Sequence, residues 1–168
     1  GTADNFVVPR PVKIGDGYRT ASANNRHSLA IKTDGSLWAW GANEYGQLGD
    51  GTKISRFVPV KIGTGFADVV AGELNSFGIK TDGSLWACGS NGTWALGDGT
   101  NVDRLEAVQI GTGYSAVSSN SGRSVALKTD GSLWVWGGDA LGKGETPALV
   151  GTGYLAAAAG WSHTLALK

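Results

Sequence analysis

One hexapeptide constrains the fold of this chain more than any other feature. Thr-Asp-Gly-Ser-Leu-Trp begins at residues 33, 81 and 129, so its three copies stand 48 residues apart. A second segment, Ile-Gly-x-Gly followed by Tyr or Phe, begins at residues 14, 62 and 110 with the same spacing. A fourth copy of it begins at Val150, only 40 residues later. Self-similarity at such a period indicates a stacked or circular repeat architecture.

These copies divide the chain, which we interpret as one repeat domain over residues 1–168, into units of unequal completeness. The third unit has lost eight residues from the loop around residues 138–145. We expect an outer strand within 1–14, full units at 15–62 and 63–110, a unit with a shortened loop at 111–150, and an incomplete unit at 151–168.

Each unit is predicted to contain four short strands and no helix. In the first unit Ser28–Ile31 leads through the Asp34-Gly35 pair to Leu37–Trp40. An Asp-Gly pair between apolar strands predicts a tight hairpin in which both central residues have positive φ. The outer strand contains Pro59, which suits an edge because proline cannot donate to a ladder. Four strands in a unit of this size are typical of a propeller blade.

The strand that precedes this hairpin should end in a tight turn. Gly and Asn tolerate the left-handed region best, so we expect positive φ where they recur at the end of that strand. The four positions are Asn24, Gly72, Asn120 and Gly160. The predicted fold class is therefore all-β, a β-propeller of four-stranded antiparallel blades. About three and a half blades are present.

The first unit also resembles a known repeat. Residues 27–52 closely resemble the regulator of chromosome condensation repeat, most of all the versions in bacteria and their phages. The second unit departs from the pattern by carrying Trp94 where the first has Gly46, and the third keeps only Leu141 and Gly142 of that loop. The resemblance implies a propeller of about seven blades. The exchange-factor and β-lactamase-inhibitor activities known in this family are not carried over, because their contact residues find no match here.

A partial ring leaves two interpretations open. An open propeller exposes the faces and edges of its end blades, which favours association. The chain is then either a piece of a longer propeller or a half-ring that closes by self-association, with a smaller ring as a third possibility. The sequence contains no methionine, so we expect a processed chain or a segment of a longer one. An extracellular, cell-surface or virion location is favoured.

Composition excludes several classes of partner. Fourteen basic residues balance fourteen acidic ones, whereas a sequence-independent nucleic-acid binder needs an excess of Lys and Arg. No apolar run is long enough for a membrane span, so we expect neither nucleic acid nor membrane insertion. The single cysteine, Cys88, excludes an intrachain disulfide.

Structural roles better explain the histidines and the cysteine, whose side chains could otherwise bind a metal or act as a nucleophile. His27 and His163 share a repeat position that holds Asn75 and Arg123 in the other units, so a set of converging metal ligands is not expected. Cys88 replaces an apolar strand residue and is predicted to be a buried thiol. We therefore predict no enzyme, no cofactor and no metal.

The acidic residues and most tryptophans also have structural explanations. Asp34, Asp82 and Asp130 belong to equivalent hairpin turns. Asp50 and Asp98, each in Gly-Asp-Gly-Thr, favour Asx turns over calcium ligation. The tryptophans that close the hexapeptide are expected to pack between blades, and they are Trp38, Trp86 and Trp134.

The turns between the first two strands of each unit vary most and should gather on one face. Trp161 lies in Gly-Trp-Ser-His-Thr, which resembles a motif of plant ultraviolet-B photoreceptors of this family, with Ser162 in place of arginine. Variable loops on a rigid scaffold are typical of binding surfaces. The candidate binding residues are Arg26, His27, Leu74, Arg123, Trp161 and His163, with Tyr45 and Trp94 as weaker candidates.

We therefore predict a non-enzymatic module that binds a protein partner, or assembles, through one propeller face. The main alternative is a structural building block of an extracellular or phage particle. A carbohydrate-active enzyme needs paired carboxylates across a cleft, and it ranks lower together with a photoreceptor-like propeller.

Overall fold

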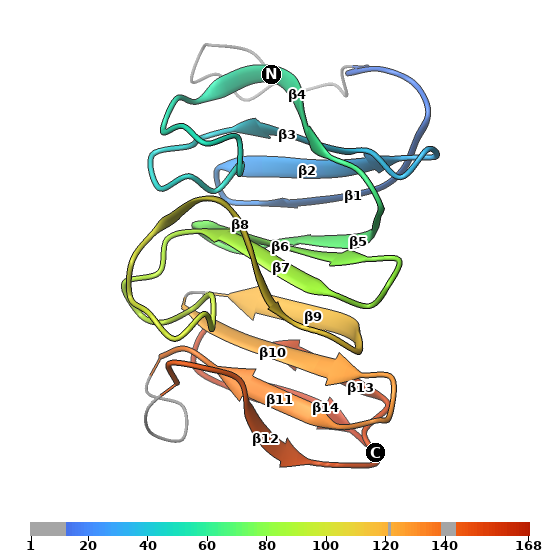
Figure 1. Ribbon diagram of the computed structural model, residues 1–168, viewed down its shortest axis with the longest axis vertical. Helices are drawn as coiled ribbons and strands as arrows, with labels where there is room; N and C mark the ends of the chain where they lie inside the picture. The colour runs from blue at the N-terminus through green and yellow to red at the C-terminus, as the bar shows by residue number, and fades with distance from the viewer. Residues whose placement is uncertain (1–12, 121, 139–143) are drawn as a thin grey trace.

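The structure is a computed structural model that describes residues 13–120, 122–138 and 144–168. Its strands form antiparallel sheets in chain order, three of four strands and one of two (Figure 1). The first sheet contains β1 (Tyr18–Asn24), β2 (His27–Lys32), β3 (Leu37–Gly41) and β4 (Arg56–Gly63). The second contains β5 (Phe66–Ala71), β6 (Asn75–Lys80), β7 (Leu85–Gly89) and β8 (Arg104–Gly111). The third contains β9 (Tyr114–Asn120), β10 (Arg123–Lys128), β11 (Leu133–Trp136) and β12 (Ala148–Gly151), and the fourth contains β13 (Ala156–Ala159) and β14 (Thr164–Leu167).

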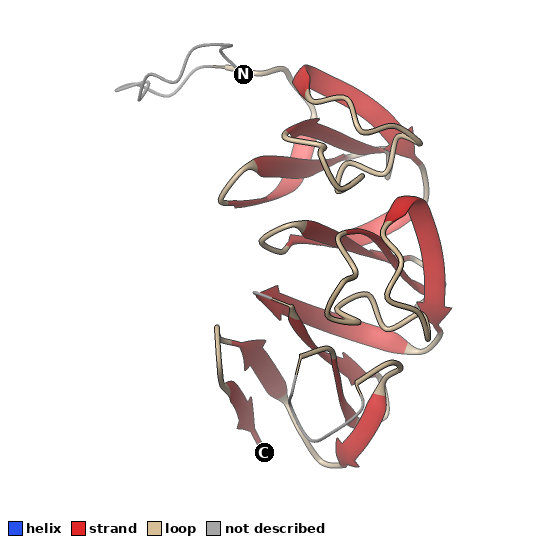
Figure 2. Cartoon of the chain, turned by 90° about the vertical axis from the view of Figure 1, so that its left-hand side faces the viewer, coloured by secondary structure: helices blue, strands red, loops and turns tan. Residues whose placement is uncertain are grey.

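The sheets stack face to face along an arc (Figure 2). The first strands of neighbouring sheets, β1, β5, β9 and β13, contact one another in that order, so they form the inner edge of the arc. The prediction of four-stranded antiparallel propeller blades is confirmed. Most of the expected outer strand within residues 1–14 lies outside the described residues, and Lys13 and Ile14 are not in a strand.

The hairpin of each hexapeptide differs in type from the predicted one. Lys32 N–H donates to Ser36 O and Gly35 N–H donates to Lys32 O, both at 2.9 Å. Gly35 has φ +77° and Asp34 does not have positive φ, so the loop has three residues and its glycine forms the bulge. The expectation of two positive φ values was wrong. The Asp34 carboxylate accepts hydrogen bonds from Ser36 N (2.9 Å) and Ser36 Oγ (2.6 Å), and this bonding fixes the turn.

The expectation of positive φ at the end of the first strand of each unit was also wrong. None of the four positions, Asn24, Gly72, Asn120 and Gly160, has positive φ. Two of them are close to a neighbouring side chain: a Cβ on Gly72 would overlap the Asn75 Oδ1 atom, and one on Gly160 would lie 2.5 Å from the His163 ring, so either side chain would have to shift.

A seam is the contact between two neighbouring sheets, and each of the first two seams contains a backbone carbonyl of the preceding sheet's long loop that accepts hydrogen bonds from the next sheet. In the first seam Gln47 O accepts from Ser76 Oγ at 2.6 Å, and Cys88 Sγ lies 3.6 Å away. In the second seam Ala95 O accepts from Ser124 Oγ at 2.9 Å and from Trp136 Nε1 at 2.8 Å. Residues 47 and 95 are equivalent, so the two seams repeat one arrangement.

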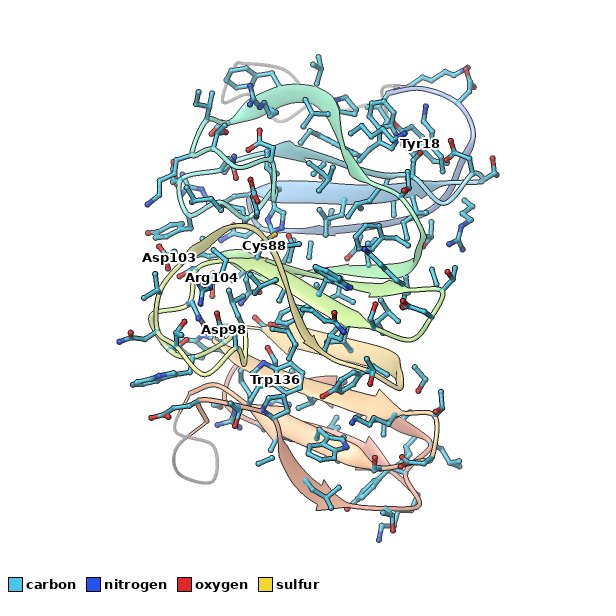
Figure 3. All side chains as sticks on the ribbon, in the orientation of Figure 1. Tyr18, Cys88, Asp98, Asp103, Arg104 and Trp136 are labelled. Carbon is cyan, nitrogen blue, oxygen red and sulfur yellow. The ribbon has the colours of Figure 1, made fainter. Side chains whose placement is uncertain are left out.

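Apolar side chains form a buried cluster in each of the first two seams. Trp136 is completely buried and packs edge-on against Phe77 of the second sheet, with ring centroids 6.1 Å apart. Trp134 packs against the same cluster, which confirms that a hexapeptide tryptophan lies between blades. Cys88 takes the place of Trp136 in the first seam, where burial raises the pKa of its thiol to about 12, as expected for an inert buried thiol. Figure 3 shows Cys88 and Trp136 within the stack.

Replacement of Trp136 by alanine should therefore destabilise the chain far more than the same change at Trp40. The two residues share a repeat position, but Trp136 is completely buried and Trp40 is partly exposed on the outer side of the first sheet. We expect Trp136→Ala to cost about 3–5 kcal/mol and Trp40→Ala roughly 1 kcal/mol. Urea unfolding measures both, and similar losses would contradict the proposed role of the second seam.

Candidate functional site

The variable turns and the long loops meet at one end of every sheet, which we call the loop face. It comprises the turns β1–β2, β5–β6, β9–β10 and β13–β14 and the described parts of the loops β3–β4, β7–β8 and β11–β12. This end lies at the left in Figure 1 and faces the viewer in Figure 2. Turn and loop are joined in the first two units: Ala42 N–H donates to Arg26 O, and Ser90 N–H donates to Leu74 O, each at 2.9 Å.

Two buried asparagines hold the long loops of this face in shape. Asn43 accepts from Leu48 N at 2.9 Å, and its Nδ2 group donates to Asp50 Oδ1 (2.9 Å) and Thr52 O (3.0 Å). Asn91 makes the equivalent bonds in the second unit, again without solvent exposure. The loop face is consequently a rigid display of side chains.

The aspartates of these loops are fully used within them. Thr52 N–H donates to Asp50 Oδ1 at 3.0 Å, an Asx turn as predicted, and Arg56 Nε donates to Asp50 Oδ2 at 2.7 Å. Asp98 pairs with Arg104 in the same way, at 2.6 Å (Figure 3). Burial raises the pKa of each carboxyl, but hydrogen bonds from Arg and Thr outweigh it, so each pKa is below its ordinary value. Within the described ranges, no group of three or more His, Cys, Asp and Glu could hold a metal ion.

The candidate residues Arg26 and Leu74 lie on the loop face. The guanidinium of Arg26 is about half exposed and lies 3.1 Å from the carboxylate of Glu44. Leu74 is partly buried beside a cavity of about 200 Å³ between the second and third sheets. This cavity is lined by Glu73, Leu74, Asn75, Ser90, Thr93, Ala95 and Gly122. Sequence reasoning missed Glu44 and Glu73, which add acidic groups to this face.

The candidates His27 and Arg123 lie in seams instead. His27 is 2% exposed, and its Nε2 is 2.8 Å from Ser76 Oγ of the second sheet. Because Ser76 donates to Gln47 O, Ser76 accepts from His27 and the imidazole is protonated at Nε2. Arg123 is half-buried between the third and fourth sheets, and its Nε has no hydrogen-bond partner among the described residues.

Trp161 and His163 stand on the turn between β13 and β14. Trp161 is 76% exposed, whereas the other six tryptophans are partly or completely buried. His163 is exposed as well, and Gly160 N–H donates to His163 O at 2.8 Å to close the turn. Trp161 is therefore a free aromatic side chain on a short, bonded turn.

Trp94 has an unusual backbone conformation. Its φ is +58°, and it is the single non-glycine residue of the described ranges with positive φ. The equivalent Gly46 has φ +81°, and a Cβ there would lie 2.7 Å from Leu105 Cα, so the first unit has no room for a side chain. A bulky residue in this region costs about 1–2 kcal/mol, and such strain concentrates at functional sites. Tyr45 is partly exposed, and its N–H donates to Gln47 Oε1 at 3.0 Å.

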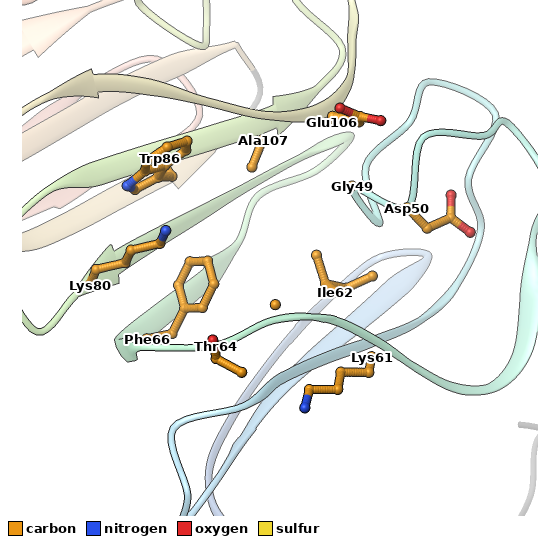
Figure 4. Close-up of a pocket in the computed structure, with 11 residues that line it drawn as sticks. Gly49, Asp50, Lys61, Ile62, Thr64, Phe66, Lys80, Trp86, Glu106 and Ala107 are labelled. Carbon is orange, nitrogen blue, oxygen red and sulfur yellow. The ribbon is translucent and has the colours of Figure 1, made fainter.

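A larger cavity, about 470 Å³, opens between the first and second sheets and is lined in part by the β3–β4 loop (Figure 4). Lys80 lies over the Trp86 ring there, 4.1 Å from its centroid. Lys61 and Glu106 add charges of opposite sign. The Asp50 carboxylate, which also lines it, already accepts from Arg56 and Thr52. The cavity therefore brings together charges and an aromatic ring without a carboxylate pair placed for acid–base chemistry.

Family models match part of the chain directly. The regulator of chromosome condensation (RCC1) repeat model matches residues 34–79, and a second RCC1 repeat model matches residues 19–47. Residues 19–79 therefore match RCC1 repeats. The ultraviolet-B receptor UVR8 of Arabidopsis thaliana is 33% identical over 60 residues, which cover 34% of this chain and 14% of that protein.

Solved RCC1-type structures share the fold. Human WBSCR16 superposes with a TM-score of 0.78 at 19% identity, over 89% of this chain and 44% of that one. Prp20p of Saccharomyces cerevisiae gives 0.76 at 19% identity, over 95% and 44%. The chain spans less than half the length of these proteins, and the likeness shows the propeller fold of its RCC1 repeats. The described residues contain no helix, hence none able to cross a membrane.

The buried His27 should make stability depend on pH between about 6.5 and 4. Burial lowers the pKa of His27 from its ordinary 6.5 to about 4. As the pH falls through this window the unfolded chain takes up a proton before the folded chain does, so the free energy of unfolding falls. The limiting slope is about 1.4 kcal/mol per pH unit. Urea unfolding at several pH values should show this slope in the wild type and a flatter profile in His27→Asn, which copies Asn75. Equal slopes would contradict the assignment.

Trp94→Gly should stabilise the chain by roughly 1 kcal/mol, because glycine adopts positive φ without a steric penalty. Trp94→Ala is the matched control: it removes the indole but keeps a Cβ in the strained backbone, so no gain is expected. Thermal or urea unfolding decides between them. A loss of stability in Trp94→Gly would show that indole packing outweighs the backbone strain.

Proposed function

We propose that this chain is a non-enzymatic protein-binding module whose loop face contacts the partner. The observation that carries the proposal is that Arg26, Leu74 and Trp161 lie on three of the four turns between the first and second strands of a sheet, all at the same end of the stacked sheets. These turns differ from unit to unit, while the strands and hairpins around them repeat. A rigid scaffold that presents variable side chains on one face is suited to recognition rather than to packing.

The chemistry of the loop face supports a protein partner. Trp and Arg are the residue types most often found as interface hot spots, and Trp161 and Arg26 are both exposed. Glu44 and Glu73 lie beside Arg26 and Leu74, so the face offers both charges around apolar anchors. For Prp20p, the published structure concerns binding to Gsp1p and histones, and yeast RCC1 has been crystallised with Kap60. Those partners belong to those proteins, and here they support only the class of function.

The groups that could catalyse a reaction have other roles. The Cys88 thiol is buried with a pKa of about 12, and His27 is occupied in the first seam. Asp34, Asp82 and Asp130 each accept from the serine two residues later. These observations support a binding role over nucleophilic or carboxylate catalysis. Turnover of any glycan in a broad screen would overturn this part of the proposal.

A peptide display library panned on the immobilised chain tests the loop face. The variant Arg26→Ala/Leu74→Ala/Trp161→Ala should bind the selected peptides at least about thirtyfold more weakly, since loss of one hot spot costs roughly 2 kcal/mol or more. The matched control is Thr33→Ala/Thr81→Ala/Thr129→Ala, three exposed positions in the hairpins at the opposite end, and it should bind like the wild type. Unchanged affinity in the loop-face variant, or a loss confined to the hairpin variant, would refute the assignment.

A further inference from the structure

The cavity on the loop face of the second seam has the dimensions of a single side chain. Its volume is about 200 Å³, and it is lined by the turn β5–β6, the loop β7–β8, the first residue of β6 and, from the third sheet, Gly122. A drug-sized ligand typically needs a pocket of about 300 Å³ or more. The cavity therefore suits one side chain of a partner better than a free small molecule.

Two small residues open this cavity. The residues equivalent to Ala95 and Gly122 in the first seam are Gln47 and Leu74. Gln47 is completely buried, and its Oε1 accepts from Tyr45 N–H at 3.0 Å, so a long side chain fills space there that Ala95 leaves open. At Gly122 a side chain would be strained by the φ of +89°, and its Cβ would lie 2.6 Å from a side-chain atom of the β7–β8 loop. The opening thus follows from the sequence of the second and third units.

The cavity has an acidic character. Glu73 is the ionisable residue of its lining. Its side chain is partly buried, and among the described residues it has no ion-pair partner. The first unit differs, because there Arg26 pairs with Glu44 at 3.1 Å. Neither the turn β5–β6 nor the loop β7–β8 contains a Lys or Arg, so the second unit supplies no base of its own on this face.

The rest of the lining combines apolar surface with hydrogen-bond acceptors. Leu74 and Ala95 supply the apolar surface, and Ser90 and Thr93 supply hydroxyl oxygens that can accept from a cation. Lysine and arginine match this combination, since their methylene groups pack on apolar surface while the charged end makes polar contacts. Charge-assisted hydrogen bonds to a carboxylate are stronger than neutral ones, whereas an apolar side chain would desolvate Glu73 without pairing it.

We propose, on the basis of the loop-face function above, that this cavity receives a lysine or arginine side chain of the protein partner and that Glu73 pairs with its charge. The sheets stack in chain order, so the turn β5–β6 stands between the turns that carry Arg26 and Trp161. A partner that covers the loop face then contacts those two residues on either side of its inserted base. Recognition is thereby specific for a protruding basic residue.

The peptides selected by panning on the wild-type chain test the cavity. We expect them to share a Lys or Arg, and replacement of that residue by uncharged norleucine should weaken binding at least about tenfold in calorimetric titration of the full chain. Glu73→Gln should bind the peptide and its norleucine form about equally. Asp68→Asn is the matched control: it removes the same charge from an exposed position of β5 outside the cavity lining, and it should keep the tenfold preference.

Ala95→Gln, which copies Gln47, should also weaken binding of the basic peptide at least about tenfold, because the longer side chain fills the cavity. Should this variant fail to fold, Glu73→Gln and the norleucine peptides still decide. Selected peptides without a shared basic residue, or a preference for the base that survives in Glu73→Gln, would overturn the cavity proposal and leave the loop-face function standing. Unweakened binding in Arg26→Ala/Trp161→Ala, with the preference lost in Glu73→Gln, would instead support the cavity and refute the wider loop-face assignment.

Discussion

The carbonyl groups of Gln47 and Ala95 join the first sheet to the second and the second sheet to the third. A four-stranded sheet has two faces, and neither can be buried within the same sheet, so the stability of the chain depends on its seams. Each carbonyl lies in the long loop of one sheet and accepts hydrogen bonds from the second strand, and in the second seam also from the third strand, of the next. Asn43 and Asn91 hold these loops from inside. The same loops carry Tyr45 and Trp94 to the surface, so the elements that join the sheets also build the loop face.

Much of this fold was predictable, because a 48-residue period with one hairpin per unit admits few architectures. The predicted backbone conformations were wrong at the hairpin turns and at the ends of the first strands, where side-chain contacts determine which of two similar conformations forms. Asp34 accepts two hydrogen bonds from Ser36, and these favour the three-residue loop over the two-residue turn. Gly72 lies against the Asn75 side chain without positive φ, whereas the sequence pattern alone predicts positive φ. Both features depend on contacts between particular atoms, and the spacing of residues in the sequence does not reveal such contacts.

The candidate site was predictable only in part. Differences in sequence between the units identified the variable turns, but a residue can differ either because it contacts a different seam or because it faces solvent. His27, Asn75 and Arg123 differ because each faces a different seam: His27 meets Ser76, Asn75 accepts from Ser119, and Arg123 faces an open cavity. Arg26 and Trp161 differ while facing solvent. Adjacent positions, such as 26 and 27, thus have opposite roles, because Arg26 lies in the exposed turn and His27 is the first, buried residue of β2.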